Sequence, residues 1–278
     1  MIAAALAAAV DRLRPTSGSA QLDAELLLAH VLGLPRAALP LRGDAALAPA
    51  MATEFAGLVE RRAAGEPVAY LVGHRDFWTL TLEVGPDVLV PRPETELLVE
   101  LGLEALRGRA TPRVLDLGTG SGAVGLALAS ERADASIDLV DASSSALAIA
   151  ERNRVRLGLG NARTLAGSWY QPVAGRRYAL VVANPPYLAA DDPHLGAAEL
   201  RHEPQLALVA GAGGLEALAA IAGAATTHLE ARGTLIVEHG WTQGQAVRAL
   251  FAAGGLVAVR TVRDLAGHER ATLGRAPG

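Results

Sequence analysis

The sequence predicts an α/β protein whose main domain is a mostly parallel sheet with helices on both faces, preceded by a small helical bundle. Three observations support this prediction. From about residue 92 onward, strand-like runs alternate with helix-like segments, which is typical of parallel sheets. Only residues 263–269 separate the last two strand-like runs, too few for a helical crossover, so these runs should pair antiparallel. A glycine-rich stretch joins the first strand of this domain to a helix.

Seven segments of the main domain have the composition of strands: short runs rich in Val, Leu and Ile, bounded by polar or glycine-containing turns. We expect the first five to be parallel and the last two to form the antiparallel hairpin. The seven segments are residues 113–117, 136–140, 161–166, 179–183, 234–239, 256–262 and 270–275.

Length and composition limit the class of protein. At 278 residues the chain favours one large domain and one smaller one. A formal net charge of −4 argues against a long nucleic acid as the main partner. Without cysteine there is no disulfide and no thiolate metal site, and we expect no metal. The apolar tract at residues 1–10 is too short for a signal peptide, and the tract at residues 206–225 is interrupted by glycines and a glutamate, which argues against a membrane span. Both observations predict a cytoplasmic protein.

Two shorter regions precede the main domain, which we place at residues 92–278. Residues 1–75 read as several short helices, with apolar side chains recurring at helical spacing and Gly and Pro as stop signals. Residues 76–91 predict a β-hairpin linker, because apolar and polar residues alternate from Trp78 to Val84. A turn at residues 85–87 would lead this strand into a second one at residues 88–90.

The glycine-rich stretch is Gly118-Thr119-Gly120-Ser121-Gly122, where glycines allow a tight turn and close approach of a ligand. The pattern alone is ambiguous, since it also matches the dinucleotide fingerprint and occurs in loops without any ligand. Asp116, just before the loop, would repel a pyrophosphate but tolerate a cationic cofactor.

Two further residues favour a nucleoside. Asp141 ends the second strand, where a carboxylate can accept hydrogen bonds from a ribose diol; its alternative role is the N-cap of the next helix, which Ser143 or Ser144 could fill instead. Trp169 follows the third strand and offers a face for adenine, although it could equally be a core residue.

The sequence Asn184-Pro185-Pro186-Tyr187 follows the fourth strand, at the edge where open α/β sheets bind ligands. It could be only a rigid turn. However, each proline removes an N–H donor and holds the preceding residue extended. The Asn184 side-chain oxygen and the Pro185 carbonyl would then converge on one planar NH₂ group, with Tyr187 as a wall of the pocket. Such a grip favours alkyl transfer to a nitrogen whose lone pair is delocalised, without a strong base.

Together these motifs resemble the class I methyltransferases, which have a Rossmann-like sheet and use S-adenosylmethionine. Over nearly its full length the chain is similar to the bacterial release-factor glutamine N5-methyltransferases, the PrmC/HemK family. Four further stretches support this resemblance: GEPVAYLVGHRDFW, VPRPETELLVE, DPHLGAAELRHEPQLAL and IVEHGW.

The resemblance implies methyl transfer to the glutamine of the Gly-Gly-Gln loop in class I peptide chain release factors, with S-adenosylhomocysteine as the second product. It places the segment 118–122, Asp141 and Trp169 against the cofactor. Asn184, beside the cofactor, and Pro185 would hold the glutamine amide, with Pro186 and Tyr187 completing that site. It also implies that the helical domain helps to dock the release factor.

Some assignments stay open. Ser168 stands where relatives often have an acidic residue, and its hydroxyl would accept from an adenine amino group more weakly than a carboxylate. Arg92, Glu94 and Glu96 have no role beyond a site wall or a helix start. The alternatives are an adenine-N6 methyltransferase acting on DNA or RNA, and a non-catalytic cofactor-binding scaffold; a dehydrogenase is a more distant third. We expect a monomer that binds neither nucleic acid stably nor membranes.

Overall fold

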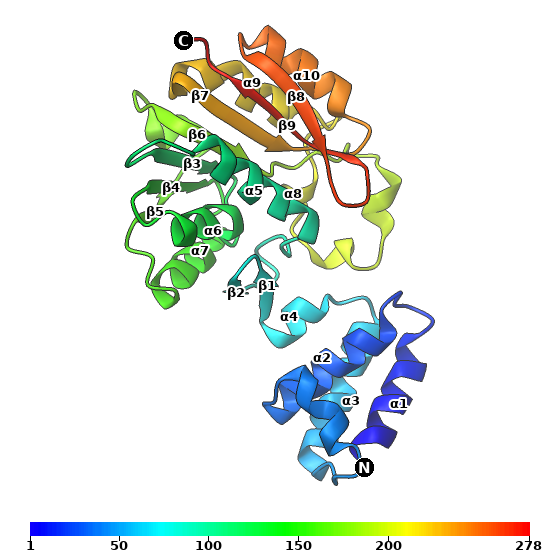
Figure 1. Cartoon of the computed structure of the whole chain (residues 1–278). Coiled ribbons are helices and arrows are strands. Elements are labelled where there is room, and N and C mark those ends of the chain that lie inside the picture. The colour runs from blue at the N-terminus through cyan, green and yellow to red at the C-terminus, as the bar shows by residue number, and fades with distance from the viewer. The chain divides into compact units, whose positions relative to one another are not determined.

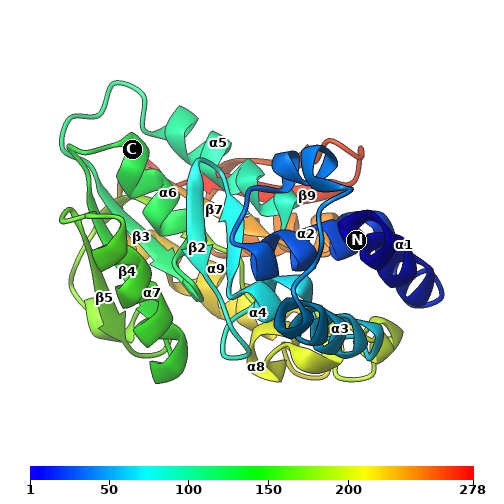
Figure 2. The same ribbon diagram turned by 90° about the horizontal axis from the view of Figure 1, so that it is seen from below.

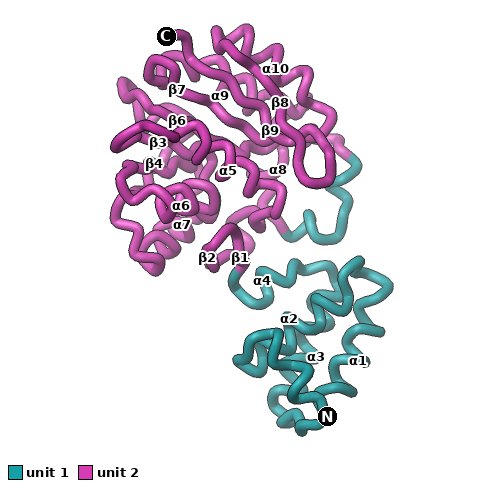
Figure 3. Tube along the Cα trace, viewed as in Figure 1, with its two compact units in different colours: residues 1–74, 193–202 teal, residues 75–192, 203–278 magenta.

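The computed structural model describes residues 1–278, which form two compact units coloured teal and magenta in Figure 3. Unit 1 comprises residues 1–74 and 193–202, and unit 2 comprises residues 75–192 and 203–278. The segment 193–202 therefore belongs with the N-terminal helices, although the chain on either side of it belongs to unit 2.

Unit 1 is a helical bundle, as the sequence predicts. Its helices are α1 (Ile2–Leu13), α2 (Ala20–Leu32), α3 (Pro49–Ala63) and α4 (Val68–Val72), with 3₁₀ turns η1 (Arg36–Arg42), η4 (Pro193–Gly196) and η5 (Leu200–His202). Apolar side chains of α1, α2 and α3 form one core; it includes Leu13, Leu27, Leu28, Phe55 and Val59. No single helix of the chain is long and apolar enough to cross a membrane, and only the pair α2 and η1, bent by 84°, passes a test of length and composition.

Unit 2 contains a seven-stranded sheet in the order β5-β4-β3-β6-β7-β9-β8 (Figure 1). The strands are β3 (Arg113–Leu117), β4 (Ser136–Asp141), β5 (Ala162–Ala166), β6 (Tyr178–Ala183), β7 (Leu229–Glu238), β8 (Val257–Arg263) and β9 (Glu269–Arg275). β3 to β7 pair in parallel, whereas β9 is antiparallel to both β7 and β8. All seven predicted strands and the antiparallel hairpin are confirmed.

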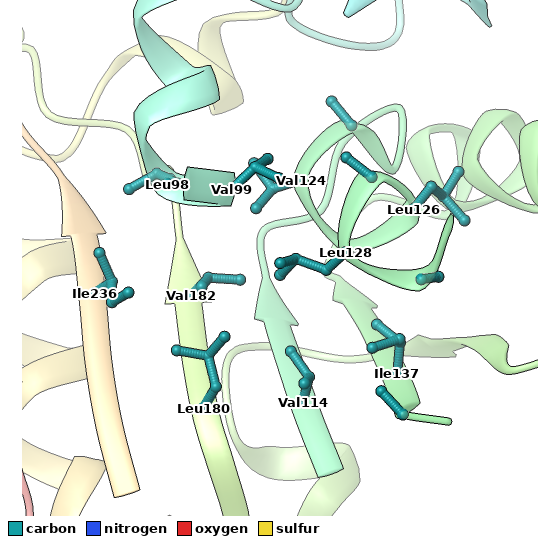
Figure 4. Close-up of a cluster of buried hydrophobic side chains, with 14 of the residues drawn as sticks. Leu98, Val99, Val114, Val124, Leu126, Leu128, Ile137, Leu180, Val182 and Ile236 are labelled. Carbon is teal, nitrogen blue, oxygen red and sulfur yellow. The ribbon is translucent and has the colours of Figure 1, made fainter. Parts of the chain in front are cut away.

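Helices cover both faces of this sheet. One face packs against α5 (Glu96–Ala105) and α6 (Ala123–Glu131), and α7 (Ser144–Arg156) lies beside α6 in both ribbon views (Figures 1 and 2). Figure 4 shows side chains of this layer, with Leu128 of α6 between its helix and the strands that carry Val114 and Val182. The other face packs against α9 (Glu216–His228) and α10 (Gly244–Ala253). Four short elements complete the unit: η2 (Pro93–Thr95), η3 (Gln171–Val173), α8 (Gln205–Leu208) and the hairpin described next.

The predicted β-hairpin exists, but its strands and its turn were wrongly placed. The observed strands are β1 (His74–Phe77) and β2 (Leu80–Glu83), joined through Trp78 and Thr79; residues 88–90 form no strand. Trp78 adopts a φ of 56°, which bulky residues rarely do. Tertiary hydrogen bonds hold it there: its backbone N–H donates to Glu96 (2.8 Å) and its indole N–H to Glu131 (2.7 Å). Local sequence preference cannot reveal such a turn.

Candidate active site

The predicted site motifs meet at one edge of the sheet because their strands are parallel and in register. Leu117, the last residue of β3, lies opposite Val140 on one side and Ala183 on the other. The loops that follow β3, β4 and β6 therefore leave the sheet side by side. Between them lies a cavity of about 470 Å³, a size typical of small-molecule sites. Eight predicted residues line it: Gly118, Thr119, Gly120, Ser121, Asp141, Trp169, Asn184 and Pro186.

Asp116, in the strand that precedes the glycine loop, fixes the conformation of that loop through hydrogen bonds. Its Oδ2 accepts hydrogen bonds from the Thr119 hydroxyl (2.6 Å) and from the backbone N–H of Gly125 (3.0 Å). The approach requires glycine at 125, since a Cβ there would lie 2.1 Å from the Leu139 side chain. Burial raises the pKa of Asp116 to about 6, although both hydrogen bonds oppose that shift. Asp116 thus ties the loop to the first turn of α6.

Asp141 orients the same loop from the neighbouring strand. One carboxylate oxygen accepts from the backbone N–H of Gly120 and the other from that of Ser143, both at 2.9 Å. Ser143 is the N-cap of α7, since its hydroxyl accepts from the backbone N–H of Ala146 (3.2 Å). Asp141 is therefore not needed as that cap. Each of its oxygens retains a lone pair that can accept a ligand hydroxyl at the cavity.

Trp169 combines the two roles that the sequence left open. Its side chain packs on the core between the sheet and α9 and also lines the cavity. A Cβ placed on Gly118 would lie 3.5 Å from the indole ring, so the ring stands directly beside the glycine loop. Ser168 is exposed and lines the same cavity.

The nitrogen of the Asn184 carboxamide is hydrogen-bonded within the protein, whereas its oxygen has no protein partner. Its Nδ2 donates to the Thr95 hydroxyl (3.2 Å), which in turn donates to Glu238 Oε2 (2.6 Å). No group of the protein donates to Asn184 Oδ1, and the residue lines the cavity. The side-chain oxygen that the sequence analysis assigned to ligand binding is thus available, while the side-chain nitrogen is engaged.

Three predicted residues, Gly122, Pro185 and Tyr187, do not line the cavity. Pro185 is buried. The Tyr187 hydroxyl donates to Glu238 Oε1 (3.3 Å), and burial raises its pKa. The Tyr187 carbonyl accepts from the Gln243 amide (3.0 Å), which ties this segment to the start of α10.

Sequence reasoning missed Thr95 and Glu238. Both lie in stretches that carried the family resemblance, PRPETE and IVEHGW, but nothing local to either stretch indicates that they meet. The other polar residues of PRPETE do not line the cavity: Arg92 pairs with Glu203, Glu96 accepts from the Trp78 backbone, and Glu94 is exposed in η2. These three therefore act as structural residues or surface residues rather than as a wall of the site.

The arrangement suits a nucleoside cofactor beside a planar amine or amide. The loops after β3, β4 and β5 form one half of the cavity. This half presents the Asp141 carboxylate, the Trp169 indole and the backbone of residues 118–121. The Asn184 oxygen and the Thr95 hydroxyl lie at the part formed by the β6 loop and η2. A hydrogen-bond acceptor fixed next to the cofactor side can orient an N–H group there.

Comparisons with known proteins identify the family and the fold of the chain. Residues 4–73 match the family described as the PrmC N-terminal domain, and residues 94–201 match the methyltransferase small domain. The release factor glutamine methyltransferase of Xylella fastidiosa (strain Temecula1) is 49% identical over 99% of this chain and 98% of its own length. That of Pseudomonas aeruginosa is 48% identical, over 95% and 96%.

A solved structure confirms the fold of the main domain. A methyltransferase from Pyrococcus furiosus superposes with a TM-score of 0.56, covering 79% of this chain and 99% of that one, at 15% sequence identity. At such low identity the likeness concerns the fold alone.

Proposed function

The chain belongs to the family of release factor glutamine methyltransferases, and from this premise we propose how its site performs the transfer. The enzyme moves a methyl group from S-adenosylmethionine to the side-chain amide nitrogen of a release-factor glutamine. The acceptor we propose is the glutamine of the Gly-Gly-Gln motif in class I release factors. The observation that supports it within the site is the Asn184 carboxamide, which presents a free oxygen to the cavity.

The lining residues fit a nucleoside cofactor. Asp141 can accept from a ribose diol, and the Trp169 ring offers a flat face for the base beside the glycine loop. The peptide units of residues 118–121 have no side chain at two positions and can approach the remainder of the cofactor closely. When bound, the cofactor supplies an electrophilic methyl group on a sulfonium and leaves as a neutral thioether.

The remaining work falls to the residues after β6. By our proposal the Asn184 oxygen accepts one N–H bond of the glutamine amide and orients its nitrogen toward the cofactor. The Pro185 carbonyl, which the sequence suggests as the second acceptor, belongs to a buried residue that does not line the cavity. The Asn184 acceptor stabilises the positive charge that develops on nitrogen as the new bond forms. The nitrogen becomes acidic only then, so its proton passes to water without a strong base. We also propose that unit 1 contributes to docking of the release factor.

The test is a methyl-transfer assay with the purified full-length enzyme, isotope-labelled S-adenosylmethionine and a purified class I release factor. Mass mapping should place one methyl group on the glutamine of Gly-Gly-Gln, and a release factor with that glutamine changed to alanine should take up none. A parallel arm offers DNA and RNA. Label that enters nucleic acid instead of the release factor would contradict the proposal and favour an adenine methyltransferase.

A further inference from the structure

We propose that Thr95 and Glu238 are positioning residues that decide which atom of the Asn184 carboxamide faces the cavity. The proposal deepens the function above and rests on it, since it takes the Asn184 oxygen as the acceptor for the glutamine amide. Neither residue needs to touch the substrate for this role. They act by fixing the direction of a chain of hydrogen bonds.

The chain of hydrogen bonds connects three separate elements of unit 2. Asn184 follows β6, Thr95 ends η2 just before α5, and Glu238 ends β7. Thr95 and Glu238 are 3% and 2% exposed, so water does not compete for their hydrogen bonds. The donor–acceptor separations are 3.2 Å from Asn184 Nδ2 to Thr95 Oγ1, and 2.6 Å from Thr95 Oγ1 to Glu238 Oε2.

The direction of this chain follows from the number of protons available. An ionised carboxylate can only accept, and a threonine hydroxyl has a single proton to donate. Once that proton points at Glu238, the Thr95 oxygen can offer only a lone pair to Asn184. The amide NH₂ group satisfies the lone pair, and the amide oxygen does not. Asn184 Oδ1 must therefore turn away from Thr95.

The surroundings of Glu238 support its role as the acceptor end. A separation of 2.6 Å lies in the range for a hydroxyl that donates to a charged carboxylate. The Tyr187 hydroxyl donates to the other carboxylate oxygen at 3.3 Å. Burial raises the pKa of Glu238 above its ordinary value, against the Thr95 hydrogen bond, the Arg270 cation and the Tyr187 hydrogen bond, so the chain runs in this direction at pH values where Glu238 is ionised. Hydroxyl groups therefore donate to both carboxylate oxygens of Glu238. Tyr187 is connected to this carboxylate directly, and Asn184 is connected to it through Thr95.

The orientation matters because a carboxamide has two chemically opposite ends of nearly equal shape. The terminal torsion of an asparagine is broad and roughly two-fold, so packing alone selects poorly between them. With the NH₂ end facing the cavity, donor would meet donor when the glutamine amide arrives. The chain from Glu238 removes this alternative before the substrate binds, which is preorganisation of the site.

Three substitutions in the full-length enzyme test the proposal. Thr95→Val keeps the shape but removes the hydroxyl, and we expect kcat to fall about tenfold, the size of one net hydrogen bond. Thr95→Ser restores the hydroxyl and should return kcat to within about twofold of wild type. Glu238→Gln does not alter a cavity residue, yet its NH₂ end can donate to Thr95 and free the hydroxyl proton to turn toward Asn184. It should therefore also lower kcat, with an unchanged dissociation constant for S-adenosylmethionine.

Tyr178→Phe is a matched control. The Tyr178 hydroxyl donates to the buried Asp138 carboxylate at 2.7 Å, at the beginning of the strand that Asn184 follows. The substitution removes the same kind of hydrogen bond far along the strand from the cavity. It should lower the thermal midpoint and leave kcat at the wild-type value. A loss of kcat in Tyr178→Phe equal to that in Thr95→Val would show a general effect of stability and overturn the proposal.

The outcomes separate this proposal from the function on which it rests. If wild type methylates the release factor and Asn184→Ala does not, but Thr95→Val and Glu238→Gln both keep the wild-type kcat, the positioning role is refuted and the function stands. If Thr95→Val fails to fold, Glu238→Gln carries the same test. Failure of Thr95→Ser to recover kcat also counts against the proposal. If wild type methylates no release factor, both proposals fail together.

Discussion

Each unit contains a network of hydrogen bonds around a buried charged side chain, and the two networks end differently. In unit 1, Arg62 is 4% exposed and pairs with Asp23 (2.6 Å) and with Glu199 of the segment 193–202. Asp23 also accepts from the hydroxyls of Ser17 and Ser19, so both buried charges, Arg62 and Asp23, have protein partners, and we call this network closed although its other carboxylate, Glu199, is half exposed. In unit 2, the network that starts at Glu238 passes through Thr95 and ends on an Asn184 oxygen without a protein partner.

This difference distinguishes a network that stabilises the fold from one that can bind a ligand. A buried network in which every group is satisfied can only hold chain segments together, as Arg62 holds the segment 193–202 to the helical bundle. A network that ends in an unused acceptor at a cavity has capacity left for a ligand. We therefore expect damage to the first to appear as lost stability, and damage to the second as lost turnover.

The largest expected effect is on the closed network. Arg62→Ala leaves Asp23 buried without its cation, and we expect the free energy of unfolding of unit 1 to fall by about 3–5 kcal/mol. Urea denaturation of the full chain, followed by circular dichroism, measures it. Arg12→Ala, which breaks the exposed ion pair with Glu60 in the same bundle, is the control and should change little. Equal losses in the two variants would contradict the assignment.

The open network should respond in the opposite way. Asn184→Ala removes the acceptor that faces the cavity, and we expect kcat to fall by about 10²–10³-fold, as when other preorganised groups are removed. Affinity for S-adenosylmethionine should stay close to wild type in titration calorimetry, and the melting temperature should change little. Unchanged turnover would exclude Asn184 as the acceptor.

Asp116 gives a pH dependence of stability with a defined sign. Its folded-state pKa, about 6, lies above the unfolded value, so between pH 4 and 6 the folded state holds more protons than the unfolded state. Stability must fall as pH rises through this window, by on the order of 2–3 kcal/mol from this group.

Asp116→Asn isolates this contribution, since an amide oxygen can still accept from Thr119 and Gly125. The difference between wild type and variant in urea denaturation should shift by that amount between pH 4 and 6. A difference that does not depend on pH would show that folding does not raise the pKa of Asp116.

A smaller effect is expected on the cofactor side. Asp141→Ala removes the proposed ribose acceptor and the acceptor for the Gly120 and Ser143 backbones. We expect binding of S-adenosylmethionine to weaken by about 1–3 kcal/mol, the cost of leaving polar groups unpaired. Titration calorimetry measures this directly, and an unaltered dissociation constant would remove Asp141 from the site.

The sequence predicts most of the fold because periodicity and turn signals are local. All seven strands of the sheet and the antiparallel hairpin β8–β9 follow from runs of apolar residues and from connection lengths. The hairpin β1–β2 was misplaced, since its turn uses a tryptophan with positive φ that distant glutamates hold. The docking of residues 193–202 with unit 1 involves the ion pair Arg62–Glu199 between positions far apart in sequence, which no local pattern indicates.

The site residues also fall into those that the local sequence predicts and those that it does not. Asp141 and Asn184 could be proposed because Asp141 ends one strand and Asn184 directly follows another, both at a predictable edge of the sheet. Thr95 and Glu238 could not, because their roles exist only where η2, β6 and β7 meet. A hydroxyl and a carboxylate in two unremarkable stretches give no sign of sharing a proton until the fold places them 2.6 Å apart.

The most direct test of the central claim, that Glu238 sets the direction in which Asn184 points, is the effect of Glu238→Gln on kcat in two backgrounds. In wild type the substitution should lower kcat. In Asn184→Asp, two carboxylates compete for one Thr95 proton. The amide introduced by Glu238→Gln can then donate to Thr95, which donates to the carboxylate at position 184, so kcat should rise severalfold. Opposite signs in the two backgrounds support the account, and the same change in both would contradict it.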